Sequence, residues 1–81
     1  MERTERHKTD ALVKARRQVD AVRVAQDELE VFIARARYWG ATWSEIAGAL
    51  GISRQSAHER YRHLRYNPAD RTAWHEPPLP I

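Results

Sequence analysis

The stretch GATWSEIAGALGISRQSAHERYR, residues 40–62, decides the fold that we predict for this chain. Thr42 and Glu45 have the spacing of a capping box, in which each side chain accepts a hydrogen bond from the backbone N–H of the other residue. Gly51 follows two turns later, and glycine readily takes the left-handed conformation with which many helices end. The spacing therefore predicts a short helix over residues 43–50.

A further helix is predicted after the turn at Gly51. Ser53 is suited to cap its start, because a serine hydroxyl accepts a hydrogen bond from the first helical turn. Asn67 precedes a proline and disfavours the helical conformation, so we expect the helix to cover residues 54–66. Small and apolar side chains occupy the positions expected to face inward on the two helices: Ile46, Ala47, Leu50, Ile52, Ala57, Tyr61 and Leu64.

The residues before this unit predict one long helix, from about Thr9 to Tyr38, and they contain neither glycine nor proline. Apolar or small residues recur along it with heptad spacing, as in a coiled coil. About 30 residues at 1.5 Å each would span roughly 45 Å, more than a domain of this size needs for its own core. The seam expected to serve dimerisation comprises Leu12, Val19, Val22, Gln26, Leu29 and Ile33, together with Ala15 and Ala36.

This seam has two interpretations. The helix either covers the core of its own domain and is otherwise solvated, or it pairs with the same helix of a second chain. A chain this small cannot bury the whole seam internally, which favours the dimer. Gln26 would then be the polar seam residue that fixes the register.

The composition is that of a small soluble protein. The chain has 81 residues, room for one domain, with 31% charged residues and a formal net charge of +3. It has no cysteine, which excludes disulfides and thiolate metal sites. No apolar run is long enough for a membrane helix or a secretory signal. We therefore expect a cytoplasmic protein without a membrane segment.

The predicted architecture is all-α and has three segments. Residues 1–39 form the long helix, residues 40–66 the two-helix unit, and residues 67–81, which hold all four prolines, an extended tail. No strand pair is expected after Leu64, so the unit is predicted to be wingless. The tail is either disordered or an extended strap with Trp74 in a groove, and its Pro-Pro-Leu-Pro end is a weakly specific recognition peptide.

Two short helices joined by a tight turn with one glycine form the helix-turn-helix pattern. Residues 40–62 resemble the helix-turn-helix of small bacterial DNA-binding regulators, in particular those of actinobacteria and their phages, with LGISRQ at residues 50–55 as the signature turn. The pattern is also similar to the fourth region of sigma factors. The resemblance covers about a third of the chain and implies a transcriptional regulator, usually a dimer, that binds double-stranded DNA.

In such units the last helix enters the major groove. Arg54 suits guanine and Gln55 suits adenine, because each can form two hydrogen bonds to one base edge. Hydroxyls and backbone N–H groups at the two helix starts suit phosphates. For Glu59 an intramolecular pair is favoured over a base contact, and His58 is balanced between DNA and solvent. The expected DNA-binding residues are Thr42, Ser53, Arg54, Gln55, Ser56, His58, Glu59, Arg62 and Arg65.

No enzymatic or cofactor site is predicted. His58 and His63 are five residues apart, whereas the zinc-protease pattern needs two histidines four apart on one helix face. The sequence therefore predicts a repressor-like regulator, a homodimer on a pseudo-palindromic operator with half-sites roughly 34 Å apart or a multiple of it. The alternatives are a helical adaptor that recruits a protein partner such as RNA polymerase, and an architectural DNA binder with little sequence preference.

Overall fold

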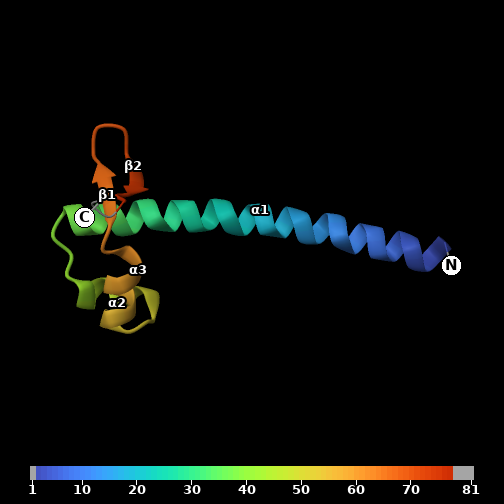
Figure 1. Cartoon of the computed structure of the whole chain (residues 1–81), viewed down its shortest axis with the longest axis horizontal. Coiled ribbons are helices and arrows are strands. Elements are labelled where there is room, and N and C mark those ends of the chain that lie inside the picture. Colours follow the sequence, from blue (N-terminus) through green and yellow to red (C-terminus); the bar gives the residue numbers. More distant parts are fainter. Residues whose placement is uncertain (1, 78–81) are drawn as a thin grey trace.

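The computed structural model describes residues 2–77, and its largest element is the long helix α1, Glu2–Tyr38 (Figure 1). The helix has 37 residues and begins at Glu2 rather than at Thr9. The added turns are rich in Glu, Arg and Lys, which are good helix formers, and no glycine or proline stops them. Within the helix, Asp10 pairs with Lys14 one turn later, at 2.9 Å between Oδ2 and Nζ.

Two short helices follow α1 and begin as predicted. Helix α2 is Trp43–Leu50 and helix α3 is Arg54–Tyr61. The Thr42 hydroxyl accepts from the Glu45 N–H at 3.1 Å, and the Glu45 carboxylate accepts from the Thr42 N–H at 3.0 Å, so the capping box is confirmed. Gly51 ends α2 in the left-handed conformation with φ 69° and ψ 30°. The chain turns sharply there and places α3 against α2.

The C-terminal part corrects the all-α prediction. Helix α3 ends at Tyr61, not at residue 66, and a β-hairpin follows: β1, Leu64–Asn67, pairs antiparallel with β2, Thr72–His75. The expectations of an extended tail and of no strand pair after Leu64 are therefore wrong for these residues. Aromatic and β-branched residues favour strands, and both strands carry them. The recognition peptide predicted for the chain end falls on residues 78–81, outside the described residues.

Side chains of the connecting loop hold the hairpin closed. The Asn67 side chain accepts from the Ala69 N–H at 3.0 Å, and the Asp70 carboxylate accepts from the Thr72 N–H at 3.1 Å. Arg71 takes a positive φ of 57° between them. Short Asn and Asp side chains that bond to the backbone two residues ahead are typical of tight turns. The proline that was expected to stop a helix thus lies in a turn between strands.

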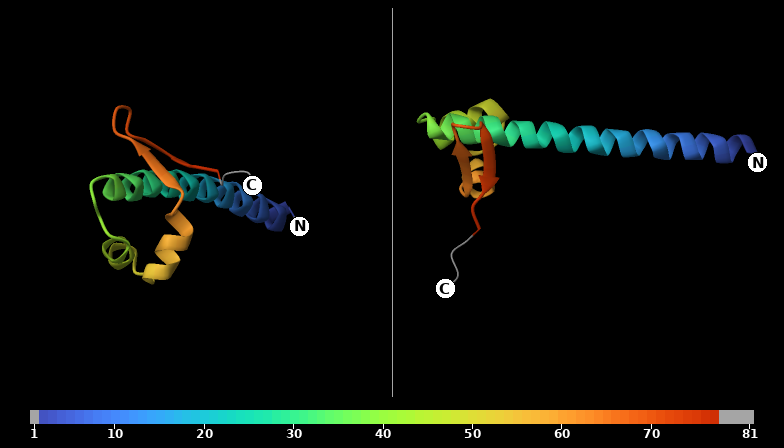
Figure 2. Two further views of the ribbon diagram at one scale, coloured as in Figure 1. Left: turned by 60° about the vertical axis from the view of Figure 1, so that its left-hand side comes forward. Right: turned by 90° about the horizontal axis from the view of Figure 1, so that it is seen from above.

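The hairpin and the two short helices lie on opposite sides of α1. In Figure 1 the hairpin loop lies above α1 while α2 and α3 lie below it, and the left view of Figure 2 shows the same arrangement. The N-terminal part of α1 extends far beyond both, and the molecule measures 57 × 30 × 26 Å. Helices α2 and α3 and the hairpin therefore pack around only the last turns of α1.

The core is small and lies where these elements meet. Its buried residues among those described are Ile33, Ala34, Ile46, Ala47, Ala57, Tyr61 and Leu64. Ile33 is only 5% exposed, so it packs within its own domain and is not free for a dimer seam. By contrast, Leu12, Val19, Val22 and Leu29 are all exposed. The seam thus divides: its last layer covers the core, and the layers before it stay in solvent.

The two glycines of α2 predict opposite effects on stability. Gly48 lies within the helix and Gly51 in the left-handed cap, and a Cβ at either position would meet no atom within 4 Å. Gly48→Ala should raise the free energy of unfolding by about 0.5–1 kcal/mol. Gly51→Ala should lower it by about 1–2 kcal/mol, the backbone strain of a left-handed L-residue. Urea denaturation measures both, and effects of the same sign would contradict the cap.

The capping box predicts a pH effect on α2. Hydrogen bonds from the Thr42 backbone and then from its side chain lower the pKa of Glu45. The stabilisation is therefore present above the ordinary glutamate pKa and is lost as pH falls through the lowered value. Because Thr42→Ala removes the hydroxyl but keeps the backbone N–H, carbon-detected NMR titration should show the pKa of Glu45 rising only part of the way toward its ordinary value. Ser44→Ala, an exposed neighbour outside the box, should leave it unchanged; an equal rise there would rule out the box as the cause.

Candidate nucleic-acid interface

Helix α3 presents almost its whole surface to solvent. Of its eight residues only Ala57 and Tyr61 are buried, and the other six are exposed. Ala57 is 0% exposed, so α3 lies as close to the rest of the domain as a methyl group allows. A helix held by two inward side chains keeps a polar surface that is free for a ligand.

The start of α3 is fixed by two serines. The Ser53 hydroxyl accepts from the Ser56 N–H at 3.1 Å and donates to the Ser56 hydroxyl oxygen at 2.8 Å. The first backbone N–H groups of a helix have no partner within it and point outward along its axis. Ser53 and Ser56 therefore lie where the sequence placed them, beside donors suited to an anion.

Two arginines of the predicted set are free. Arg54 lies in the first turn of α3 and Arg62 directly after its last turn, and both are exposed. Among residues 2–77 the ion pairs are Lys14–Asp10, Arg65–Glu76 and His75–Glu30, so neither guanidinium has an acidic partner. A free guanidinium at each end of α3 can bind a base edge or a phosphate without first breaking a contact.

A hydrogen bond joins two side chains in the middle of α3. The Gln55 amide nitrogen donates to the Glu59 carboxylate at 3.2 Å, one turn along the same helix. This agrees with the interpretation that Glu59 forms an intramolecular pair. The bond holds the Gln55 side chain along the helix surface and leaves the amide oxygen free to accept. Glu59 therefore orients the Gln55 side chain.

A stack of side chains braces α3 against the rest of the domain. The His58 and Trp43 rings meet edge to face, with their centroids 5.4 Å apart. The Arg37 guanidinium lies over the Trp43 ring, 4.5 Å from its centroid. Arg37 also donates to the Ala41 carbonyl at 2.8 Å. Trp43 thus packs against both neighbouring helices, and His58 has a packing role although it is exposed. The stack fixes the angle between α1 and α3.

Arg65 is placed differently from the prediction. It lies on β1, not on the third helix, and its Nε is 2.7 Å from Glu76 Oε2. Its Nη1 donates to the backbone carbonyls of Arg62 and Leu64. The guanidinium therefore ties the end of α3 to the end of the hairpin. Its charge is partly neutralised, which separates it from Arg54 and Arg62.

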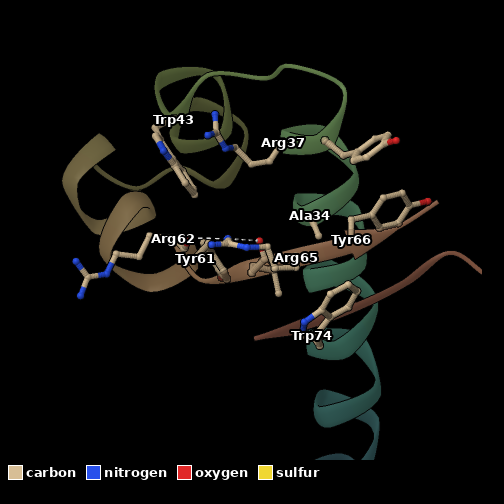
Figure 3. Close-up of a pocket in the computed structure, with 10 residues that line it drawn as sticks. Ala34, Arg37, Trp43, Tyr61, Arg62, Arg65, Tyr66 and Trp74 are labelled. Carbon is tan, nitrogen blue, oxygen red and sulfur yellow. Dashed lines mark hydrogen bonds between the residues drawn. The ribbon is translucent and has the colours of Figure 1, made fainter. Parts of the chain in front are cut away.

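Three arginines border a cleft that the sequence did not reveal. It has a volume of about 320 Å³ and lies between the end of α1, the start of α2 and the hairpin (Figure 3). Arg37, Arg62 and Arg65 line it together with Trp43, Tyr61, Tyr66 and Trp74. In Figure 3 the Arg62 guanidinium points away from the other two. No local pattern joins Arg37 to Trp74, because they lie on different elements far apart in the sequence.

Comparison with protein-family models, with curated protein sequences and with solved structures finds no significant match for this chain. Within the described residues, no helix combines the length and the apolar character needed to cross a membrane. Over the same residues, no group of three His, Cys, Asp or Glu side chains is close enough to hold a metal ion. Function therefore has to be argued from the geometry of α3 and its surroundings.

Proposed function

We propose that this chain is a sequence-specific regulator of transcription that binds double-stranded DNA. In this proposal α2 and α3 form a helix-turn-helix, and α3 enters the major groove. The observation that carries it is α3 itself: a helix capped at its start, with six of eight residues exposed and a free guanidinium at either end. A major groove about 12 Å wide admits a helix of about 10–12 Å diameter.

The contacts divide into base and backbone contacts. Arg54, in the first turn, would bind guanine O6 and N7, and Gln55 would bind an adjacent base in the orientation set by Glu59. Thr42 and Ser53, at the starts of α2 and α3, would lie against phosphates with the neighbouring backbone N–H groups. Arg62 would bind a phosphate beyond the end of α3. This set combines direct base contacts with the electrostatic contacts that give affinity.

The position of the hairpin supports this use of α3. Its loop lies on the far side of α1 from α2 and α3 (Figures 1 and 2). The loop therefore does not cover the exposed side of α3, and it does not reach the groove that α3 would occupy. In this proposal the hairpin that follows α3 makes no contact with DNA.

Arg54→Ala should reduce affinity for the preferred DNA and relax selectivity at one base position. The expected loss is about 1–3 kcal/mol, the usual discrimination of one two-bond arginine–guanine contact. The preferred sequence would first be selected from random duplexes by the purified chain. Fluorescence anisotropy at fixed salt would then compare that duplex with single-base variants of it.

Arg71→Ala is the matched control. Arg71 is also an exposed arginine with no ion pair among residues 2–77, but it lies in the hairpin loop away from α3. It should leave both affinity and selectivity nearly unchanged. Equal losses for the two variants would mean that only overall charge matters, as in an architectural binder. No loss for Arg54→Ala would contradict the role of α3.

The exposed apolar side of α1 favours one alternative, a helical adaptor for a protein partner. The two functions differ in their response to salt. DNA binding releases counterions, so its affinity should fall steeply as salt rises, whereas an apolar helix contact should change little. Arg62→Ala should reduce the slope of log K against log salt by about 0.9, the contribution of one phosphate on duplex DNA. A flat dependence for the unmodified chain would favour the adaptor.

A further inference from the structure

The free part of α1 and an apolar groove at its other end fit one another. The groove has a volume of about 160 Å³ and is lined almost wholly by apolar atoms of Leu29, Phe32, Ile33 and Ala36 on α1 and of Ile46, Ala49 and Leu50 on α2. Phe32 is 62% exposed at its rim, as is Leu12 near the free end of the helix. A straight helix cannot bring its own Leu12 to this groove, because the two are about 30 Å apart along its axis.

We infer that a second copy of this chain occupies the groove, with the two α1 helices antiparallel. Leu12 of each copy then lies beside Ala36 and Leu50 of the other, and Val19 lies beside Leu29. The contact is the same on both copies, as two-fold symmetry requires. This gives a geometry to the homodimer that the sequence predicts, and the inference does not depend on binding to DNA.

The geometry of the seam leads to the groove. A heptad repeat on a straight helix drifts around its axis by about 20° per heptad. Between Leu12 and Ala36 the seam therefore rotates away from Glu30 and Ala34, which face the helix's own domain, and toward Leu29 and Phe32. At the level of Leu29 and Phe32 the seam therefore lies next to α2, which forms the second wall of the groove. A helix lying on the exposed seam would enter the groove without displacing Ile33 from the core.

The charged side chains beside the seam also favour the antiparallel direction. On the other flank of the seam a cleft of about 550 Å³ is lined by Asp27, Glu30, Arg60 and His75, and one oxygen of the Glu30 carboxylate there lies 3.1 Å from His75 Nε2. In the antiparallel pair Arg16 of the second copy reaches this cleft. Within one helix Arg16 and Glu30 are about 21 Å apart, and a parallel in-register pair would keep them so. The antiparallel pair therefore brings Arg16 to an acidic residue of the other copy, which the parallel pair does not. Arg23 lies near the symmetry axis, where its long side chain can extend into solvent.

A parallel pair fits the structure less well. It would need Ile33 to face Ile33 of the other copy, but this residue is buried in its own domain. It would also leave the groove at Phe32 uncovered, because both grooves would lie at the same end of the paired helices. The antiparallel pair instead brings each exposed free end to the groove of the other copy. It buries both apolar features in a single contact.

The test uses the full chain without DNA. Because the chain has no cysteine of its own, any disulfide must join the introduced cysteines. Leu12→Cys and Ala36→Cys are prepared separately, mixed and oxidised. The antiparallel pair predicts a disulfide between the two different variants and none in either variant alone. A disulfide-linked dimer of Leu12→Cys alone would show a parallel pair and overturn the inference. A monomeric mass of the unmodified chain, or a dimer without the mixed disulfide, would overturn it as well.

Two matched substitutions test the contact itself by sedimentation equilibrium. Leu12→Asp should weaken self-association by at least about tenfold, because it removes a buried leucine from both ends of the contact. Val24→Asp is the control: Val24 is 57% exposed on the same free stretch but lies off the seam. An equal effect of the two would contradict the groove. Circular dichroism checks that both variants keep their helix content.

A charge exchange tests the direction independently. Arg16→Glu and Glu30→Arg should each weaken the dimer, and the double variant should restore it, because each new pair joins the two copies. Arg17→Glu, the same charge change on the outer face, should have little effect. A double variant weaker than both single variants would contradict the antiparallel contact.

The failures of the two proposals are distinguishable. A chain that dimerises in this way but does not bind DNA would overturn the proposed function alone, and a DNA-binding monomer would overturn only this inference.

Discussion

The fold depends on small buried side chains that let α2 and α3 approach closely, while α1 packs mainly against the hairpin. Ala34, Ala47 and Ala57 lie among the buried residues where α1, α2 and α3 meet, and Ala57 has no exposed surface. The methyl groups of Ala47 and Ala57 let α2 and α3 come near one another, and Ile33 and Tyr61 belong to the same buried cluster. A larger side chain at any of the three would push a helix outward, since well-packed cores accept added volume at a cost of about 1–3 kcal/mol. The position of α3 against α2 is set by this contact, whereas the stack on Trp43 joins α3 to α1.

The same contact explains why α3 is available for binding. Because Ala57 and Tyr61 are enough to anchor it, every other residue of the helix faces solvent. The second anchor comes from outside the core: Trp43 lies between Arg37 and His58 and joins three helices. Rigid placement of a polar helix by few contacts suits a surface that must enter a groove. It also means that the domain has little apolar surface to bury by itself, which makes a partner for α1 physically advantageous.

The sequence predicted what is local and missed what is not. The capping box at Thr42, the cap at Ser53 and the turn at Gly51 were predictable, because each signal lies within a few residues. The hairpin was missed because Asn67 and its following proline also stop helices, and because Asn and Asp side chains that bond to the backbone also occur at helix ends. The Arg65–Glu76 pair and the Arg37–Trp43 contact depend on the fold itself. Heptad spacing likewise cannot tell a residue that covers its own core, such as Ile33, from one that faces a second chain.

Helix α1 connects the two proposals through its rigidity. It runs from Glu2 to Tyr38 without glycine or proline, so no hinge separates its free part from the residues that carry α2 and α3. In the antiparallel pair the symmetry axis passes near residue 24, and each domain is anchored at Ile33 and Ala34. The two anchors are then roughly 30 Å apart along the helices, close to the rise of one turn of DNA, about 34 Å. The register of the helix pair, rather than a flexible linker, would set the spacing of the two half-sites.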